Sequence, residues 1–228
     1  MLSIIIPTLN EATHIAHLIK HLYSNASFQQ IEIVISDGGS SDNTVAMAIE
    51  AGAEVVISPK PGRATQMNYG AGFAKGDILY FVHADVIPPK SYLSDIEKAI
   101  QDGYDVGRYI TEFNTTKWYL KLNAFFTRFD WFVCYGGDQT MFVTKHFFDA
   151  HGGFNNNLRI MEDYEITERL RTHVVKYCII KKGVLISDRK YQKNNWWKVQ
   201  MANSIMIKMY KQGADQSAMV EKYKSMLR

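Results

Sequence analysis

The chain has 228 residues, of which 46% are hydrophobic and 21% charged, a balance typical of soluble globular proteins. The net charge of +3 is small and the basic residues are scattered, with only a mild enrichment after Lys176, so composition does not indicate a nucleic-acid partner. No stretch approaches the ~20 apolar residues of a membrane span, the N-terminus lacks a basic signal-peptide segment, and Cys134 and Cys178 have no metal-like spacing. We therefore expect a protein of a reducing compartment, the cytoplasm.

In the first hundred residues, short apolar runs alternate with helical patterns. The strand-like runs are rich in Ile and Val and nearly continuous in apolarity, as in parallel strands buried on both faces; they cover 2–6, 31–36, 54–57 and 78–82. Helical patterns lie between them at 12–24, 42–51 and 64–75. This alternation predicts βαβ units with right-handed crossovers.

The rhythm changes after about residue 102. The expected elements are a strand at 105–113, an aromatic helix at 116–131, a strand at 140–144, a helix at 163–172, strands near 176–180 and 184–187, and a helix at 194–212. No linker separates the two parts. The sequence predicts an α/β domain spanning 1–228, whose second half extends the sheet of the first.

Two polar segments follow the first two predicted strands. Pro7-Thr8-Leu9-Asn10-Glu11 lies at the edge where ligands bind in open α/β sheets, although Asn10 as a helix cap and Glu11 as a dipole partner would explain it equally well. Asp37-Gly38-Gly39 follows the second strand, and the Asp37 carboxylate could accept an N–H of a nucleobase. A turn with a helix cap explains Ser41 and Asp42 but leaves Asp37 unexplained.

Gly62-Arg63 begins a helix, so a helix N-terminus and a guanidinium favour an anion there; the alternative is an exposed arginine. His83-Ala84-Asp85 follows the apolar run 78–82, so Asp85 stands at a strand end. A carboxylate there can hold a divalent cation, which can hold a diphosphate, whereas the alternative is an ordinary surface acid.

Glu162-Asp163 opens the helix predicted at 163–172. Adjacent acids at a helix start are ordinary partners of the helix dipole. They are also the right type for a general base that takes a proton from a hydroxyl. The sequence alone leaves both interpretations open.

In this order and spacing, the segments resemble glycosyltransferase family 2, whose catalytic domain has the GT-A fold. The resemblance rests on Ile4 to Glu11, Asp37 to Asp42, Gly62-Arg63, His83-Ala84-Asp85 and Glu162-Asp163, and it covers the chain from Ser3 to about Tyr210. The compact length and the segments 62–68 and 135–139 look most like a small bacterial subgroup, the radical-SAM/selenodomain-associated transferases.

The resemblance implies a role for each segment. Glu11 and Asp37 would hold the nucleoside, Arg63 would reach the base or diphosphate, and Arg189 would approach the leaving diphosphate. Asp85 would bind Mn²⁺ or Mg²⁺, and Asp163, with Glu162 beside it, would be the catalytic base. The remaining residues expected at the nucleotide-sugar are Pro7, Thr8, Asn10, Gly38, Asn68, His83, Ala84 and Asp138.

His83 departs from the family pattern, which has an acid at that position. Its imidazole could ligate the metal together with Asp85, or it could hydrogen-bond a ribose hydroxyl. Because His83 replaces an anionic side chain, the resemblance supports metal binding less strongly than it supports nucleotide binding.

The resemblance divides the chain into a nucleotide-binding half at 1–102, an acceptor and catalytic half at 103–190 and a C-terminal helical segment at 191–228. It predicts inverting, metal-assisted transfer of a sugar from a nucleotide-diphospho-sugar to an unknown acceptor hydroxyl. One alternative is a nucleotidyltransferase, but the loop Pro7–Glu11 has neither the glycine nor the lysine expected there. The other is a nucleotide-sugar binder without catalysis.

The helix at 194–212 has two interpretations. Trp197, Met201, Ile205 and Met209 are spaced four apart, which favours a stripe packed on the domain with Trp196 and the lysines at its rim. Alternatively, Trp196 and Lys198 suit a bilayer interface, which would place the protein peripherally at the inner face of the membrane.

Overall fold

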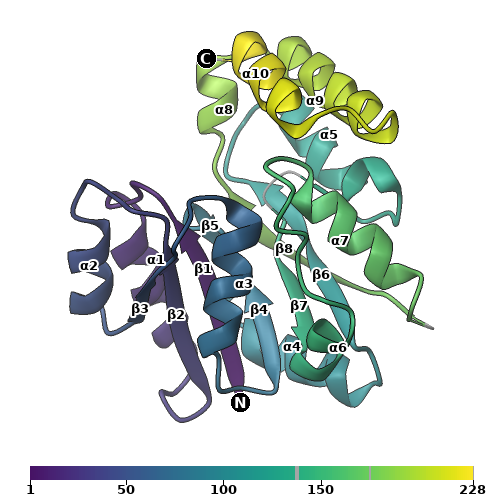
Figure 1. Cartoon of the computed structure of the whole chain (residues 1–228). Coiled ribbons are helices and arrows are strands. Elements are labelled where there is room, and N and C mark those ends of the chain that lie inside the picture. The colour runs from purple at the N-terminus through teal and green to yellow at the C-terminus, as the bar shows by residue number, and fades with distance from the viewer. Residues whose placement is uncertain (137–138, 175, 228) are drawn as a thin grey trace.

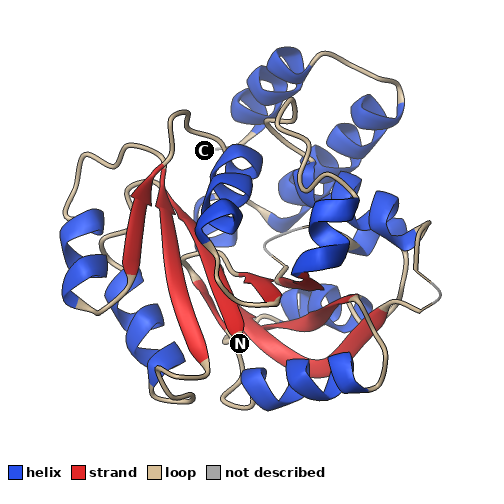
Figure 2. Ribbon diagram, turned by 60° about the horizontal axis from the view of Figure 1, so that its bottom comes forward, coloured by secondary structure: helices blue, strands red, loops and turns tan. Residues whose placement is uncertain are grey.

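One mixed sheet of eight strands, in the order β3-β2-β1-β4-β7-β6-β8-β5, runs through both halves of the chain. The structure is a computed structural model that describes residues 1–136, 139–174 and 176–227. Helices cover both faces of the sheet (Figures 1 and 2). The predicted α/β architecture, in which the second half of the chain extends the sheet of the first, is confirmed.

The N-terminal half has the predicted alternation of strands and helices. Strand β1 (Leu2–Thr8) pairs in parallel with β2 (Ile31–Asp37) and β4 (Ile78–Phe81), and β2 pairs in parallel with β3 (Glu54–Ile57). The connecting helices are α1 (Ile15–Tyr23), α2 (Thr44–Glu50) and α3 (Arg63–Phe73). Since β1 and β4 are adjacent and parallel, the segments that follow them meet at one edge of the sheet.

The second half joins that sheet through antiparallel pairing of β4 with β7 and of β7 with β6. The remaining strands of the sheet are β5 (Val86–Ile87), β6 (Val106–Phe113), β7 (Met141–Thr144) and β8 (Cys178–Ile186). The remaining helices are α4 (Tyr92–Gln101), α5 (Trp118–Phe126), the short 3₁₀ helix η1 (Phe132–Cys134), α6 (Lys145–Ala150), α7 (Glu162–Arg171), α8 (Arg189–Lys193), α9 (Trp196–Lys211) and α10 (Gln216–Met226).

Alternating side chains of β1 separate the core into two layers. Ile4 and Ile6 belong to a cluster with α1 and α4, whereas Ile5 packs with α3, α6 and α7 on the other face. All three isoleucines are fully buried. The continuous apolar run predicted a strand that is buried on both faces, and this prediction is confirmed.

Three predicted elements were wrong in extent. The strands near 176–180 and 184–187 form the single strand β8, because a bulge opposite Tyr109 and Ile110 accommodates Lys181 and Lys182, which interrupt the apolar pattern. The helix predicted at 116–131 ends at Phe126. Buried Arg108 explains that end, since its guanidinium donates to the carbonyl oxygens of Thr127 and Phe129.

The predicted buried stripe of the C-terminal helix was wrong in its first half, whereas its second half, Ile205 and Met209, is partly buried against the neighbouring methionine cluster. Trp197 and Met201 are 74% and 54% exposed, and the buried residues of α9 are Val199, Ala202 and Met206. The stripe is shifted because α9 packs both on the domain, through Met161, and on α10, through Met219. Among the described residues, no helix is both long and apolar enough to cross a bilayer.

Candidate functional site

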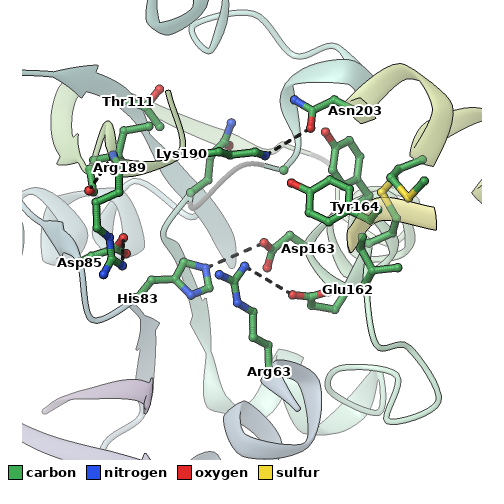
Figure 3. A pocket seen from close by; sticks show the side chains of 18 of the residues that line it. Arg63, His83, Asp85, Thr111, Glu162, Asp163, Tyr164, Arg189, Lys190 and Asn203 are labelled. Atoms are coloured by element: carbon green, nitrogen blue, oxygen red, sulfur yellow. Dashed lines mark hydrogen bonds and ion pairs between the residues drawn. The ribbon is translucent and has the colours of Figure 1, made fainter. Parts of the chain in front are cut away.

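A cavity of about 930 Å³ opens at the carboxyl ends of β1 and β4. Pro7, Thr8 and Glu11 form part of one wall with His83-Ala84-Asp85. Parts of α5, α7, α8, α9 and α10 form the opposite side. Figure 3 shows side chains of both sides pointing into this space. Most of the predicted site residues are thus brought together.

The loops after β1 and β2 are joined by side-chain hydrogen bonds. Asn10 has a positive φ of 57° and its Oδ1 accepts from the Ser41 N–H, while its own N–H donates to the Ser40 hydroxyl. Helix α1 begins only at Ile15, so Asn10 is not its cap. Asn10 instead fixes the shape of the loop that carries Glu11.

Asp37 is buried and its carboxylate is occupied within its own loop. One oxygen accepts from the hydroxyls of Thr8 and Ser40, and the other accepts from the N–H groups of Gly39 and Ser40. Burial raises the pKa of Asp37, but these hydrogen bonds outweigh it and leave the pKa below its ordinary value. Asp37 and Gly38 are not part of the cavity wall.

Gln66 is a site residue that sequence reasoning missed. It lies in α3, is buried, and its Nε2 donates to the carbonyl oxygens of Thr8 and Ser36, both at 2.8 Å. Its Oε1 accepts from the Gly62 N–H. Gln66 therefore holds the start of α3 against the ends of β1 and β2.

Gly38 and Asn68 support the site from outside its wall. A Cβ on Gly38 would meet Gln66 Oε1 at 2.9 Å, so a side chain there would push Gln66 away. Asn68 accepts from the Phe154 N–H and donates to the Phe154 carbonyl and to Asn156 Oδ1, which connects α3 to the segment before α7. Asp138, also expected at the nucleotide-sugar, lies outside the described residues.

Arg189 brings two predicted carboxylates together. Its Nη2 donates to Asp85 Oδ2 at 2.8 Å and lies 3.6 Å from Glu11 Oε1. Burial raises the pKa of Glu11; Arg189 opposes that rise and Asp85 adds to it, and the net pKa is above the ordinary value. Two carboxylates separated by 74 residues in the chain thus share one guanidinium group, that of Arg189 at the start of α8.

The acid pair of α7 faces Arg63 and His83. Glu162 is buried with Oε1 3.9 Å from Arg63 Nη1, and Asp163 Oδ2 lies 3.9 Å from His83 Nε2 (Figure 3). Met161, directly before this pair, has a φ of 71°, a strained backbone for a residue other than glycine. The first turn of α7 is thus presented to the cavity from a fixed and strained position.

The described residues contain no group of three or more His, Cys, Asp or Glu side chains that could hold a metal ion. Asp85 and Glu11 nevertheless converge on one point, and Glu11 Oε2 is buried without a hydrogen-bond partner. Mg²⁺ and its analogues are commonly held by one or two carboxylates plus phosphate oxygens and water. The residues fit a cation that binds together with a diphosphate, with Asp85 and Glu11 as its protein ligands.

The side of the cavity away from β1 holds further residues that sequence reasoning missed. Lys190 Nζ donates to Asn203 Oδ1 at 3.4 Å and lies 5.1 Å from the ring centroid of Tyr223. These residues come from α8, α9 and α10, and all three line the cavity. No motif identified them, because they are collected only by the packing of the last three helices.

A family model described as Glycosyl transferase family 2 matches residues 3–162, most of the chain. The chain belongs to glycosyl transferase family 2. It is 30% identical over 95 residues to glucosyl-3-phosphoglycerate synthase of Mycolicibacterium smegmatis, covering 38% of this chain and 31% of that protein. It is 29% identical over 126 residues to undecaprenyl-phosphate 4-deoxy-4-formamido-L-arabinose transferase of Edwardsiella ictaluri, covering 51% and 39%. The chain therefore spans less than half the length of these relatives.

Solved structures share the fold of this family 2 chain. Staphylococcus aureus TarS in complex with UDP-GlcNAc matches with a TM-score of 0.68 and 18% identity, over 82% of this chain and 58% of that one. The mannosyltransferase PcManGT of Pyrobaculum calidifontis, in complex with GDP-Man and Mn²⁺, matches with 0.67 and 18%, over 90% and 61%. Glucosyl-3-phosphoglycerate synthase of Mycobacterium tuberculosis, in complex with Mn²⁺, UDP and glucosyl-3-phosphoglycerate, matches with a TM-score of 0.63 and 17% identity, over 95% of this chain and 81% of that one.

Proposed function

We propose that this glycosyltransferase moves a sugar from a nucleotide-diphospho-sugar to an acceptor hydroxyl with inversion, assisted by Mn²⁺ or Mg²⁺. The observation that carries this proposal is the composition of one cavity. It has the Asp85–Arg189–Glu11 cluster on the side of β1 and β4, and the acids Glu162 and Asp163 on the other side. A donor lying across the strand ends would have its diphosphate at the first group and its sugar before the second.

On the donor side, two guanidinium groups favour a diphosphate. Arg189 stands between two carboxylates, and Arg63 is the first residue of α3, where the helix N-terminus also favours an anion. The cation held by Asp85 and Glu11 would offset charge on the leaving diphosphate. Thr8 and Gln66 keep the loops that carry Glu11 and Arg63 in place.

On the acceptor side, Asp163 is proposed as the general base. Its carboxylate would take the proton of the acceptor hydroxyl while that oxygen attacks the anomeric carbon. The bond from that carbon to the diphosphate oxygen breaks, and the diphosphate leaves with the electron pair. A single displacement of this kind inverts the configuration. His83 Nε2 lies 3.9 Å from Asp163 Oδ2, which supports a role for His83 in orienting the base as an alternative to ligating the metal.

The comparisons support the donor class. Structures of the same fold were solved with UDP-GlcNAc, with GDP-Man and Mn²⁺, and with UDP and Mn²⁺. They include both uridine and guanosine nucleotides, so they do not select a base for this chain. The subgroup resemblance, the single-domain organisation and the cytoplasmic location remain predictions.

The test is release of nucleoside diphosphate from a panel of UDP- and GDP-sugars, with Mn²⁺, Mg²⁺ or EDTA and with water as the acceptor. We expect release from one nucleotide series and its loss in EDTA. Binding in a thermal-shift measurement without release would favour the non-catalytic binder. Formation of pyrophosphate from a nucleoside triphosphate and a sugar phosphate would favour a nucleotidyltransferase.

A further inference from the structure

Helix α5 presents an apolar face to solvent. Trp118, Leu122 and Phe125 are spaced by four and three residues, so they lie on one side of the helix, and they are 72%, 43% and 44% exposed. The buried residues of α5 are Leu120 and Ala124. An amphipathic helix normally turns its larger apolar side chains toward the core, so α5 is unusual in turning them outward.

This apolar surface continues onto α9. Consecutive ring contacts join Trp118 to Tyr119, Tyr119 to Trp196 and Trp196 to Trp197, with centroid distances of 6.0, 6.1 and 4.5 Å. Trp197 is 74% exposed. Figure 1 places α5 and α9 at the same end of the molecule, away from α1 and α2. We call the exposed side chains of Trp118, Leu122, Phe125 and Trp197 the aromatic face.

Beyond the C-terminal end of α5, the apolar surface reaches the mouth of the cavity. Phe125 contacts the rings of Phe126 and Phe129, and Phe129 stacks on Trp131 at 4.7 Å. Phe126, Trp131 and Val133 are exposed and also line the cavity. The aromatic face is therefore continuous with an entrance to the site that contains Asp163.

The segments that carry the aromatic face are basic. Residues 114–129 contain Lys117, Lys121 and Arg128 and no acid, and residues 189–214 contain six Lys or Arg and no acid. Asp188 adjoins these segments and pairs with Lys117 at 3.6 Å, so the basic excess of the surface rests on the other Lys and Arg residues. The whole chain has 26 basic and 23 acidic residues, so this excess is local. Exposed Trp and Phe beside Lys and Arg match a bilayer interface, where the rings enter the headgroup region and the cations meet anionic lipids.

We propose that the aromatic face docks the enzyme on an anionic lipid bilayer, with the cavity mouth turned toward the membrane. A second copy of this chain is a poorer occupant, because a two-fold interface would bring these basic segments against each other. The docking proposal rests on the exposed aromatic face and its basic neighbours and does not depend on the proposed function. The further consequence, that an acceptor held in the membrane reaches Asp163, rests on the proposed function.

Vesicle flotation of the full chain tests this inference. The probes are vesicles of phosphatidylcholine alone and of phosphatidylcholine mixed with phosphatidylglycerol, each at low and high salt. We expect recovery with the mixed vesicles at low salt. The double variant Trp118→Ala/Phe125→Ala should not be recovered with these vesicles. The control Phe28→Ala removes a ring that is 70% exposed and lies before β2, outside the aromatic face, and it should float like the wild type.

A second variant separates the charge from the rings. Lys121→Gln/Arg128→Gln removes two cations worth about 1 kcal/mol each near an anionic surface, so binding should weaken roughly thirtyfold. Unchanged thermal melting, together with the unchanged melting shift that a nucleoside diphosphate and Mn²⁺ induce, would show that fold and donor site are intact. Absence of that shift in the wild type would count against the proposed function and not against docking.

Two results would overturn the docking proposal. One is failure of the wild type to float with any vesicle at any salt concentration. The other is a dimer in solution that Trp118→Ala/Phe125→Ala converts to a monomer, since the aromatic face would then be an interface between copies.

Discussion

The acidic side chains of the cavity each have a basic partner. Asp85 contacts Arg189, Glu162 lies near Arg63, and Asp163 lies near His83. A buried or half-buried carboxylate is costly without such a partner. The charges of the site are thus paired within it, and a diphosphate that binds with a cation, as proposed, would exchange partners with groups already in place.

Asp85→Asn should remove the metal-dependent part of nucleoside diphosphate binding. A charged contact of this kind contributes about 1.5–3 kcal/mol, so the affinity in Mn²⁺ should fall by roughly one to two orders of magnitude, while the affinity in EDTA should not change. Calorimetric titration measures both. Asp77→Asn is the matched control. Asp77 directly precedes β4, at the end of that strand opposite to Asp85, and its side chain is 94% exposed. An unchanged Mn²⁺-dependent affinity in Asp85→Asn would remove Asp85 from the metal site.

Asp37 makes the fold sensitive to acid. Its pKa in the folded chain lies below the ordinary value of 3.8, despite burial, because Ser40, Thr8 and Gly39 donate to the charged form. The stability it contributes is therefore complete above that ordinary value and is lost as pH falls through the folded-state pKa. Asp37→Asn should lower the melting temperature at neutral pH and flatten its decline under acid. Melting temperatures of the wild type and the variant, measured from neutral pH to below pH 3.8, test this role of Asp37. A parallel decline of the two melting temperatures would contradict it.

The helices and strands differ in how well the sequence predicted them. The strands β1, β2, β3 and β4 were predictable because a continuous Ile and Val run between turn residues has few other solutions in a soluble protein. The buried side of α9 was not predictable. The spacing of Trp197, Met201, Ile205 and Met209 indicates a helix face but does not tell which neighbour covers it, and α10 decided that.

Packing of α10 positions the acid pair. Met219 is fully buried against Met161 and Met206, and Met161 is the strained residue before Glu162. Met219→Ala should lower the free energy of unfolding by about 2–5 kcal/mol and lower kcat more than donor affinity, because α7 loses its support. Denaturant unfolding and steady-state kinetics measure the two effects. Met201→Ala, which truncates a methionine 54% exposed on α9, should change neither. Equal effects of the two substitutions would contradict this role of Met219.

At the scale of the molecule, the cavity lies where the two halves of the sheet meet. The parallel half contributes Glu11, Arg63 and Asp85, and the second half contributes Glu162, Asp163 and Arg189. The sequence predicted that the segments after β1 and β4 meet, because the ends of parallel strands share an edge. The presence of Glu162, Asp163 and Arg189 in the same site was implied only by the resemblance to the family. The sequence could not predict Gln66, Lys190 or Asn203 as site residues, since their places depend on how helices pack across the two halves.

We propose that Asp163 is the base of a donor-cleaving site, and the kinetics of Asp163→Asn test this proposal most directly. Release of nucleoside diphosphate in Mn²⁺ gives kcat, and calorimetric titration gives donor affinity. We expect kcat to fall roughly 10²-fold or more with affinity unchanged, because a base acts in the transition state. Glu168→Gln, an exposed acid on the same helix, should leave both unchanged. A loss of donor affinity with kcat preserved would contradict the claim and make Asp163 a binding residue.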